Sequence, residues 1–205
     1  MNCQGLLPSN WTREAQEELF RLLENNERLQ LGEVGLDKRF HDKVPMEKQE
    51  QNLETQLRFA IAHNRSVSLH CVQSTGRLLT ILSKLHYRPY SILWHGFTGS
   101  METAAELFRL KVLISIGPKF KGNPEELFEA NPNMVLETDY ETGCETGCDK
   151  RPGLKTGKNH GQNHDYILKT HYERCAVELG ITANQLSARC LKMFALFSIG
   201  DVQQK

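Results

Sequence analysis

The chain has 205 residues, enough to bury a sizeable core within one domain. Its 25 Lys and Arg residues balance its 25 Asp and Glu residues. This balance excludes a chain-wide basic footprint for nucleic acid, although a local basic patch stays open. No apolar run approaches the roughly 18 residues that span a bilayer, and no signal-peptide pattern opens the chain. The six cysteines are scattered, which favours free thiols in a reducing compartment. We therefore expect one cytoplasmic domain over residues 1–205 with no membrane partner.

Helical periodicity and apolar runs alternate along the chain. The predicted helices cover residues 12–24, 45–64, 74–85, 100–110, a short segment from 124, 164–179 and 182–197. Strand-like runs lie between them, at residues 29–37, 67–70, 91–95, 112–116 and 134–139. Continuous apolar strands that are each followed by a helix are typical of a parallel sheet covered on both faces. The pattern predicts an α/β protein, either an open doubly wound sheet or a (β/α)8 barrel.

Local residues mark several of the predicted helix ends. Pro45 suits the first turn of the second helix. Ser74 and Ser100 stand where an N-cap is expected. Near the C-terminus, Gly180 suits the stop of one helix, and the spacing from Thr182 to residue 185 predicts a capping box at the start of the next.

Four polar residues, each at or near the end of its own strand-like run, are the candidate functional residues: Glu33, His70, His95 and Asp139. Imidazole and carboxylate groups bind divalent cations. In a parallel sheet or barrel the C-terminal strand ends converge on one face, so we expect one metal or catalytic centre there.

Each of these four residues also has a structural interpretation. Glu33 could be a buried ion-pair partner, and His70 could be a core histidine whose hydrogen bonds are satisfied. His95 could simply end a strand beside the turn at Gly96, and Asp139 could cap a loop. The shared centre is favoured because all four residues occupy equivalent strand ends.

Four short motifs resemble those of a known family. They are Gly32-Glu33-Val34-Gly35-Leu36-Asp37, His70-Cys71, His95-Gly96-Phe97-Thr98-Gly99 and Glu137-Thr138-Asp139. In this order and spacing they are similar to the motifs of TatD-type metal-dependent hydrolases, and the resemblance runs from about Gly5 to the last helix. It implies a TIM-barrel fold of the amidohydrolase type, and several members of the family are deoxyribonucleases.

The resemblance also implies roles for the four candidate residues. Glu33 would bridge two divalent ions, which could be Mg²⁺, Mn²⁺ or Zn²⁺. His70 and His95 would ligate one ion, and Asp139 would ligate the other and orient the attacking water. Glu33 and Asp139 would then be the catalytic carboxylates, with DNA or another phosphodiester as the substrate. Bound cations lower the pKa of water, and a nearby carboxylate can accept its proton.

The chain departs from the family pattern near its start. The family carries a His-x-His pair on its first strand, whereas the first histidine here is His41. Residues 2–11 resemble the family's third-strand region, with Leu7 in place of a usual histidine. The strands would then be strands three to eight of a barrel that typically needs roughly 250 residues. We expect that about two strand–helix units are missing through truncation, rather than supplied by another chain or lost in a degenerate homologue, and that the sheet edges are left unpaired.

Two further departures concern the substrate. Val72-Gln73 follows His70-Cys71, where the family often places a basic residue, and Tyr140-Glu141 follows Asp139 in place of a small residue and proline. Three basic residues are candidate phosphate contacts, although solvated surface charge is the stronger interpretation for each: Arg77, Lys119 and Lys121.

A second metal-like spacing lies after the last predicted strand. Cys144 and Cys148 are followed by His160 and His164, close to a Cys2His2 zinc spacing. The segment is rich in Gly, Lys, Thr and Asn and lacks the pattern of a zinc finger, so a loop is the favoured interpretation. Two function classes stay open for the chain: a metal-dependent phosphodiesterase or nuclease, and a non-catalytic homologue that keeps a partial metal site.

Overall fold

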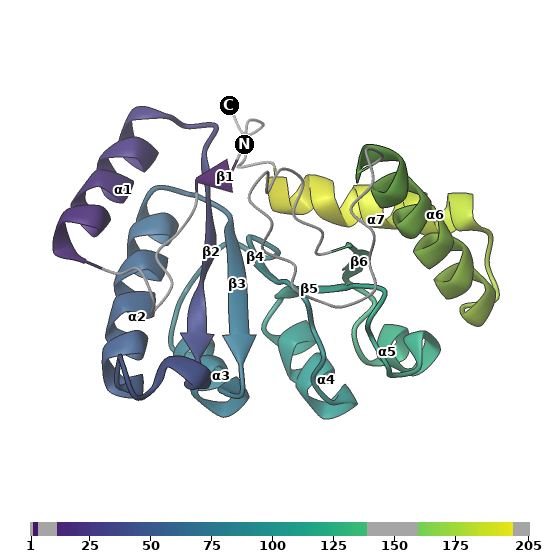
Figure 1. Ribbon diagram of the computed structural model, residues 1–205, viewed down its shortest axis with the longest axis horizontal. Coiled ribbons are helices and arrows are strands. Elements are labelled where there is room, and N and C mark those ends of the chain that lie inside the picture. The colour runs from purple at the N-terminus through teal and green to yellow at the C-terminus, as the bar shows by residue number, and fades with distance from the viewer. Residues whose placement is uncertain (1, 4–11, 139–159, 199–205) are drawn as a thin grey trace.

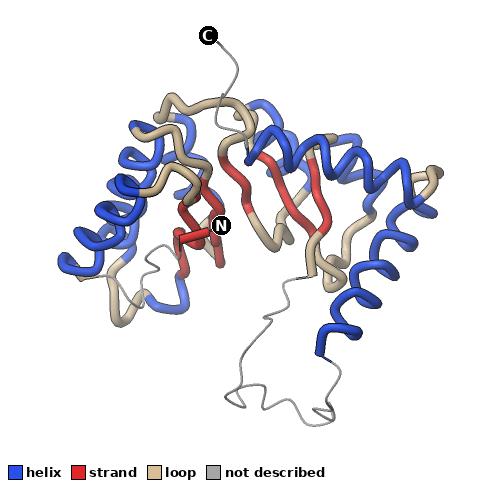
Figure 2. The backbone as a smooth tube through the Cα atoms, turned by 90° about the horizontal axis from the view of Figure 1, so that it is seen from above, coloured by secondary structure: helices blue, strands red, loops and turns tan. Residues whose placement is uncertain are grey.

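The structure, a computed structural model, describes residues 2–3, 12–138 and 160–198. Six strands form one sheet in the order β1-β2-β3-β4-β5-β6, and every neighbouring pair is parallel. The strands are β1 (Asn2–Cys3), β2 (Gln30–Asp37), β3 (Val67–Val72), β4 (Ile92–Trp94), β5 (Leu113–Ile116) and β6 (Met134–Leu136). The sheet is curved, and its strands follow an arc when the molecule is seen from above (Figure 2).

Helices separate the strands in the chain and cover the sheet (Figure 1). They are α1 (Arg13–Asn25), α2 (Met46–Ala62), α3 (Thr75–Ser83), α4 (Met101–Arg109), α5 (Pro124–Ala130), α6 (His160–Glu178) and α7 (Ala183–Ser198), with a 3-10 turn η1 (Lys38–Phe40) after β2. Consecutive parallel strands with a helix in every crossover are the build of a (β/α)8 barrel, and six such strands lie within the described residues. The predicted α/β barrel class is confirmed. Within the described residues β1 and β6 are unpaired edges of the sheet, as expected for strands three to eight.

The core lies between the sheet and the helices, and it explains why these segments are helical. In α2 the residues that face the sheet, Leu53, Leu57 and Ala60, recur at helical spacing and are fully buried. In α3 the equivalent residues are Leu78 and Leu82. None of the described helices combines the length and apolar character that a bilayer span requires.

Most predicted helix ends are confirmed. The Ser100 hydroxyl accepts a hydrogen bond from the Thr103 amide at the start of α4. Thr182 and Gln185 exchange the two bonds of a capping box at the start of α7. The prediction for Ser74 was only half right, because this residue occupies the N-cap of α3 but its hydroxyl donates to the Val72 carbonyl instead of capping the helix.

Several boundaries differ from the prediction. Helix α6 begins at His160 rather than at residue 164. Strand β2 ends at Asp37 as predicted, and Glu33 is the fourth of its eight residues, so it lies within the strand rather than at its end. Strand β3 likewise continues past His70 to Val72, because the β2–β3 ladder extends as far as the pair Asp37 and Val72.

The C-terminal end of the last helix, α7, is hydrogen-bonded to residues that precede two of the strands. The Phe197 carbonyl accepts hydrogen bonds from the Ser66 hydroxyl and from Arg88, and the Leu196 carbonyl accepts a second bond from Arg88 at 2.7 Å. Ser66 precedes β3 and Arg88 precedes β4, so the C-terminal end of α7 lies against the N-terminal ends of these strands. The candidate site lies toward the C-terminal ends of the same strands.

Candidate metal centre

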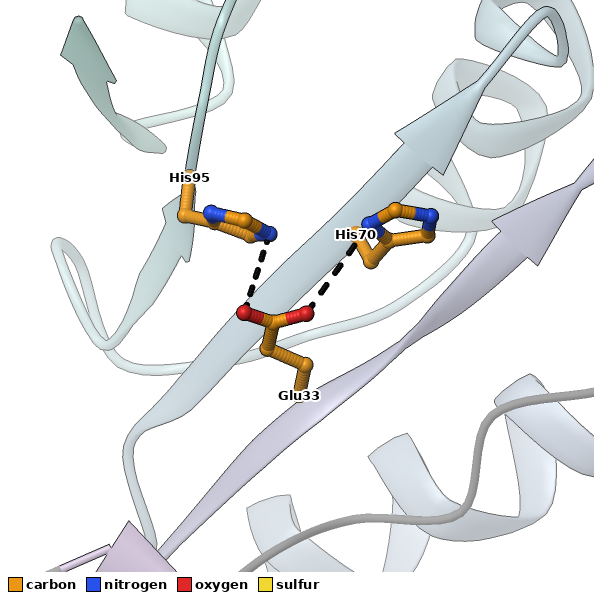
Figure 3. A group of neighbouring side chains, drawn as sticks. All are labelled: Glu33, His70 and His95. Atoms are coloured by element: carbon orange, nitrogen blue, oxygen red, sulfur yellow. Dashed lines mark ion pairs between the residues drawn. The ribbon is translucent and has the colours of Figure 1, made fainter. Parts of the chain in front are cut away.

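Three of the four predicted residues converge in space. Glu33 comes from β2, His70 from β3, and His95 directly follows β4 (Figure 3). One ligand atom from each residue can be chosen so that all three atoms lie within 4.8 Å of one another. The expectation that these strands bring the three side chains together is therefore met, although the strands continue beyond two of them.

Glycines allow β2 and β3 to approach closely at this point. A Cβ atom at Gly35 would lie 1.8 Å from the His70 carbonyl oxygen, and one at Gly32 would lie 2.7 Å from the Ser68 Cβ. The β2–β3 register also shifts between Gly32 and Val34, on either side of Glu33. Any larger side chain at Gly35 would force the strands apart and would move His70 away from Glu33.

The Glu33 carboxylate faces one ring nitrogen of each histidine. Its Oε1 atom lies 3.2 Å from Nε2 of His95, and its Oε2 atom lies 3.9 Å from Nδ1 of His70. Nitrogen and oxygen ligands at about 2.1 Å from a tetrahedral Zn²⁺ would lie roughly 3.4 Å from one another. The observed distances are therefore of the size that a shared divalent cation requires.

One ligand atom makes no well-aligned hydrogen bond. Nε2 of His95 is buried and forms no hydrogen bond among the described residues, although the Glu33 carboxylate lies 3.2 Å from it. Buried polar atoms are usually hydrogen-bonded in folded proteins. The donor set of one carboxylate and two imidazoles suits a borderline divalent ion, so these residues fit a metal ion.

Charges around His95 reinforce this arrangement. Burial disfavours the charged imidazole, but the Glu137 and Glu33 carboxylates outweigh burial and raise the pKa of His95 to about 10. His95 in turn holds the pKa of the Glu33 carboxyl below its usual range, against the effect of burial. Without a metal the site thus holds a proton between two carboxylates, and a cation could take the place of that positive charge.

Glu137 is a site residue whose individual role the sequence did not reveal. Its carboxylate accepts the Gly96 N–H at 2.7 Å and the Ser115 hydroxyl at 2.6 Å, and it lies 3.7 Å from Nδ1 of His95. Burial raises the pKa of Glu137, but His95 and Ser115 outweigh it and lower the pKa. The signal that could have found Glu137 is its place directly after β6, equivalent to the place of His95 after β4.

The remaining predicted residues are not all brought to this centre. Asp139, Cys144 and Cys148 lie outside the described residues, and the side chains of His160 and His164 at the start of α6 are likewise not described. The zinc interpretation of that segment therefore stays a prediction. Three cysteines are described as free thiols: Cys71, Cys175 and Cys190.

The three basic candidates differ in their surroundings. Arg77 pairs with Glu47 and Glu50, so its guanidinium is already engaged by surface carboxylates. Lys119 and Lys121 are exposed in the segment that follows β5. Because β4 and β5 are parallel, this segment and His95 both follow the C-terminal ends of their strands. These two lysines remain the candidate phosphate contacts.

Sequence comparison places the chain in a family. The family described as "TatD related DNase" matches residues 2–196. The human 3'-5' RNA nuclease TATDN2 is 30% identical over 115 residues, which cover 56% of this chain and 15% of that protein. The uncharacterized metal-dependent hydrolase YabD of Bacillus subtilis is 32% identical over 116 residues, covering 53% of this chain and 45% of YabD. The 3'-5' ssDNA/RNA exonuclease TatD of Escherichia coli is 35% identical over 95 residues, covering 46% of this chain and 36% of that enzyme. The chain thus spans less than half the length of these relatives.

Solved structures agree on the fold. The TatD homologue YjjV of Escherichia coli superposes with a TM-score of 0.73 at 22% identity, covering 95% of this chain and 75% of YjjV. A TatD family hydrolase of Entamoeba histolytica superposes with a TM-score of 0.63 at 18% identity, covering 94% of this chain and 72% of that one. With the family match over nearly the whole sequence, the chain belongs to the family of TatD-related DNases.

Proposed function

We propose that this chain hydrolyses phosphodiester bonds in nucleic acid with the help of one or two divalent cations. The observation that carries the proposal is the convergence of Glu33, His70 and His95, which can each offer one ligand atom within 4.8 Å of the others. Family membership supports it, and so do the relatives named as nucleases.

The proposed roles follow from the chemistry of the side chains. Glu33 supplies an ionised carboxylate, and the two histidines supply neutral ring nitrogens that bind a cation. When bound, a cation would lower the pKa of water and neutralise charge on the phosphate oxygens. We assign Asp139 as the fourth ligand and as the group that accepts the proton of the attacking water. The ion itself could be Mg²⁺, Mn²⁺ or Zn²⁺, because carboxylate favours the first two and imidazole favours the third.

The proposed substrate is DNA or RNA with a free end. The relatives named as 3'-5' exonucleases act on single-stranded DNA or RNA, and one relative is named as an RNA nuclease. The chain has no net charge, so electrostatic attraction over the whole surface contributes little to binding. Contacts to phosphate would instead be local, with Lys119 and Lys121 as the proposed pair.

Cleavage by the purified chain tests this proposal. End-labelled single-stranded DNA and RNA are incubated with the chain in Mg²⁺, Mn²⁺ or Zn²⁺, and shortened products are expected that disappear with EDTA. Asp139→Asn should abolish cleavage, while the same change at exposed Asp165 on α6 serves as the matched control and should keep it. Equal cleavage by the Asp139→Asn variant would contradict the assigned role of Asp139.

A second candidate is a non-catalytic homologue that keeps a partial metal site. The composition of the site favours it, because among the described residues Glu33, His70 and His95 supply ligands for one ion but not a full set for two. Metal analysis of the purified chain separates the two candidates. One bound ion without cleavage supports the non-catalytic homologue, whereas metal-dependent cleavage supports the enzyme.

A further inference from the structure

A second carboxylate contacts His70 on the side of the ring that faces away from Glu33. Asp37 is the last residue of β2 and is only 2% exposed. Its Oδ2 atom lies 3.2 Å from Nε2 of His70, while Nδ1 of the same ring lies 3.9 Å from Glu33. The imidazole is therefore held between two carboxylates, one at each ring nitrogen.

Asp37 is itself fixed from two sides. The Arg39 backbone N–H and Nε both donate to Oδ1 at 2.9 Å, and Nη2 of Arg39 donates to Oδ2. Buried Gln49 holds the Asp37 backbone, because its side-chain oxygen accepts the Asp37 N–H at 2.9 Å and its Nε2 donates to the Asp37 carbonyl at 3.2 Å. A carboxylate tied in this way cannot turn away from His70 without breaking several hydrogen bonds.

The hydrogen bonds of Asp37 decide which nitrogen of His70 carries the proton. Both oxygens of the Asp37 carboxylate accept from the Arg39 guanidinium, and Oδ2 also lies 3.2 Å from Nε2 of His70. An ionised carboxylate can only accept hydrogen bonds, so the neutral His70 ring must place its proton on Nε2. The lone pair is then on Nδ1, the atom that faces Glu33.

We infer that Asp37 is a positioning residue, which fixes the tautomer and orientation of His70 so that Nδ1 is ready to bind a cation. This inference rests on the proposed metal-binding role of His70. A carboxylate behind a metal-binding histidine fixes the ring and raises its basicity, and the loss of such a partner typically weakens metal binding about 10–100-fold.

A purely structural role for Asp37 makes a different prediction. Asp37 also caps the short η1 turn through the Arg39 amide, so its loss could lower stability alone. In that case the folded variant would bind metal as the wild type does, and the His70 tautomer would not change. Metal affinity and ring tautomer therefore separate the two roles, and neither measurement requires nuclease activity.

The experiment compares Asp37→Ala, Asp37→Asn and Arg39→Ala in the full chain. Zn²⁺ and Mn²⁺ affinities are measured by calorimetry, and the His70 tautomer is read from the ring ¹⁵N shifts of the metal-free chain at pH 8. Asp37→Ala should weaken metal binding about 10–100-fold and lower the population of the Nε2–H tautomer relative to the wild type. Arg39→Ala is the matched control, because it removes the partner of Asp37 but keeps the Asp37–His70 contact. It should therefore weaken metal binding less than Asp37→Ala does.

The isosteric Asp37→Asn variant keeps the test decisive if Asp37→Ala fails to fold. Its carboxamide can still accept one hydrogen bond but lacks the charge, so an intermediate loss of affinity is expected. Affinity within about threefold of the wild type in the folded variants, together with an unchanged His70 tautomer, would overturn the inference. If the wild type binds no metal, the proposed function fails, and the tautomer measurement still decides the role of Asp37.

Discussion

His95 and His171 differ in the partners of their ring nitrogens. His95 follows β4 at the strand ends, whereas His171 lies in α6 and contacts β5. His171 in α6 is 2% exposed, its Nε2 donates to the Ile116 carbonyl at 2.9 Å, and its Nδ1 accepts from Arg174 at 3.3 Å. His95 also lies mostly out of solvent, but its Nε2 makes no hydrogen bond within the described part of the chain and instead lies 3.2 Å from the Glu33 carboxylate. The ring of His171 is therefore held by a backbone carbonyl and an arginine, whereas the ring of His95 faces carboxylates that can share a cation with it.

The pKa values of these two histidines move in opposite directions. Burial, helped by the Arg174 charge, lowers the pKa of His171 against the opposing effect of the Ile116 carbonyl. The carboxylates of Glu137 and Glu33 overcome burial and raise the pKa of His95 to about 10. A histidine that serves packing is thus kept neutral, while the candidate ligand sits in a negative environment that also attracts cations.

Metal affinity should give the largest difference between the two histidines. His95→Ala removes a ligand atom and should weaken Zn²⁺ binding by more than about 100-fold, because changes outside the ligand set already cost 10–100-fold. The matched variant His171→Ala should bind Zn²⁺ within about threefold of the wild type. Titration calorimetry on both variants measures this, and an equal loss in both would break the comparison.

The alkaline stability of the metal-free chain should be the next largest effect. The pKa of His95, about 10 in the folded chain, exceeds the ordinary value of about 6.5. Its stabilising contribution is therefore complete below about pH 6.5 and is lost as the pH rises toward 10. In EDTA the free energy of unfolding should fall by at least about 1.4 kcal/mol, the equivalent of one pKa unit.

Denaturant unfolding at pH 6.5, 8 and 9.5 measures this decline in the free energy of unfolding. The decline should be smaller in the His95→Gln variant. If the wild type and the variant lose stability equally over this range, His95 is not the group responsible.

Below neutral pH, His171 should make the free energy of unfolding change with pH in the opposite direction. This change should be smaller than the alkaline change due to His95. The pKa of His171 is lowered on folding, so the unfolded chain binds its proton first as the pH falls below about 6.5. The contribution of neutral His171 to stability is complete above that pH and is lost below it. His171→Gln should therefore lose less stability than the wild type between pH 7 and 5.5 in the same assay. A steeper loss in the variant would contradict this assignment.

The smallest expected effect is a loss of stability, without a change in metal affinity, when a helix cap is removed. Thr182→Ala removes the capping box at the start of α7 and should lower the free energy of unfolding by about 1 kcal/mol. Zn²⁺ affinity should not change, because the cap belongs to the packed region and not to the strand ends. Chemical denaturation and calorimetry on this variant check both parts, and a weaker affinity would show that the two regions are coupled.

The sequence was sufficient for the order of elements and for part of the site. Apolar runs and caps such as Ser100 and Thr182 are local signals, and they predicted the alternation of strands and helices correctly. The meeting of Glu33, His70 and His95 followed from parallel topology, since equivalent strand positions converge whatever the details of packing.

Other features depend on contacts between distant segments, and local patterns could not reveal them. The ladder partner, and not the apolar pattern, decides where β3 ends, so the strand continues past His70 to Val72. The role of Glu137 depends on its hydrogen bonds to Gly96 and Ser115, and the role of Asp37 depends on its contact with His70 on the neighbouring strand. His171 gave no signal in the sequence, because its partner carbonyl lies 55 residues away.

The contacts at the end of α7 constrain the order in which the chain can fold. Ser66 lies 131 residues before Phe197, and Gln30 lies 168 residues before Ser198, to whose carbonyl its side chain donates. Strands β1 to β5 each pair with the next strand along the chain, so they can assemble in sequence during synthesis. The α7 contacts form only after all of these strands have been made. Until then the N-terminal ends of β3 and β4 lack their last hydrogen-bond partners.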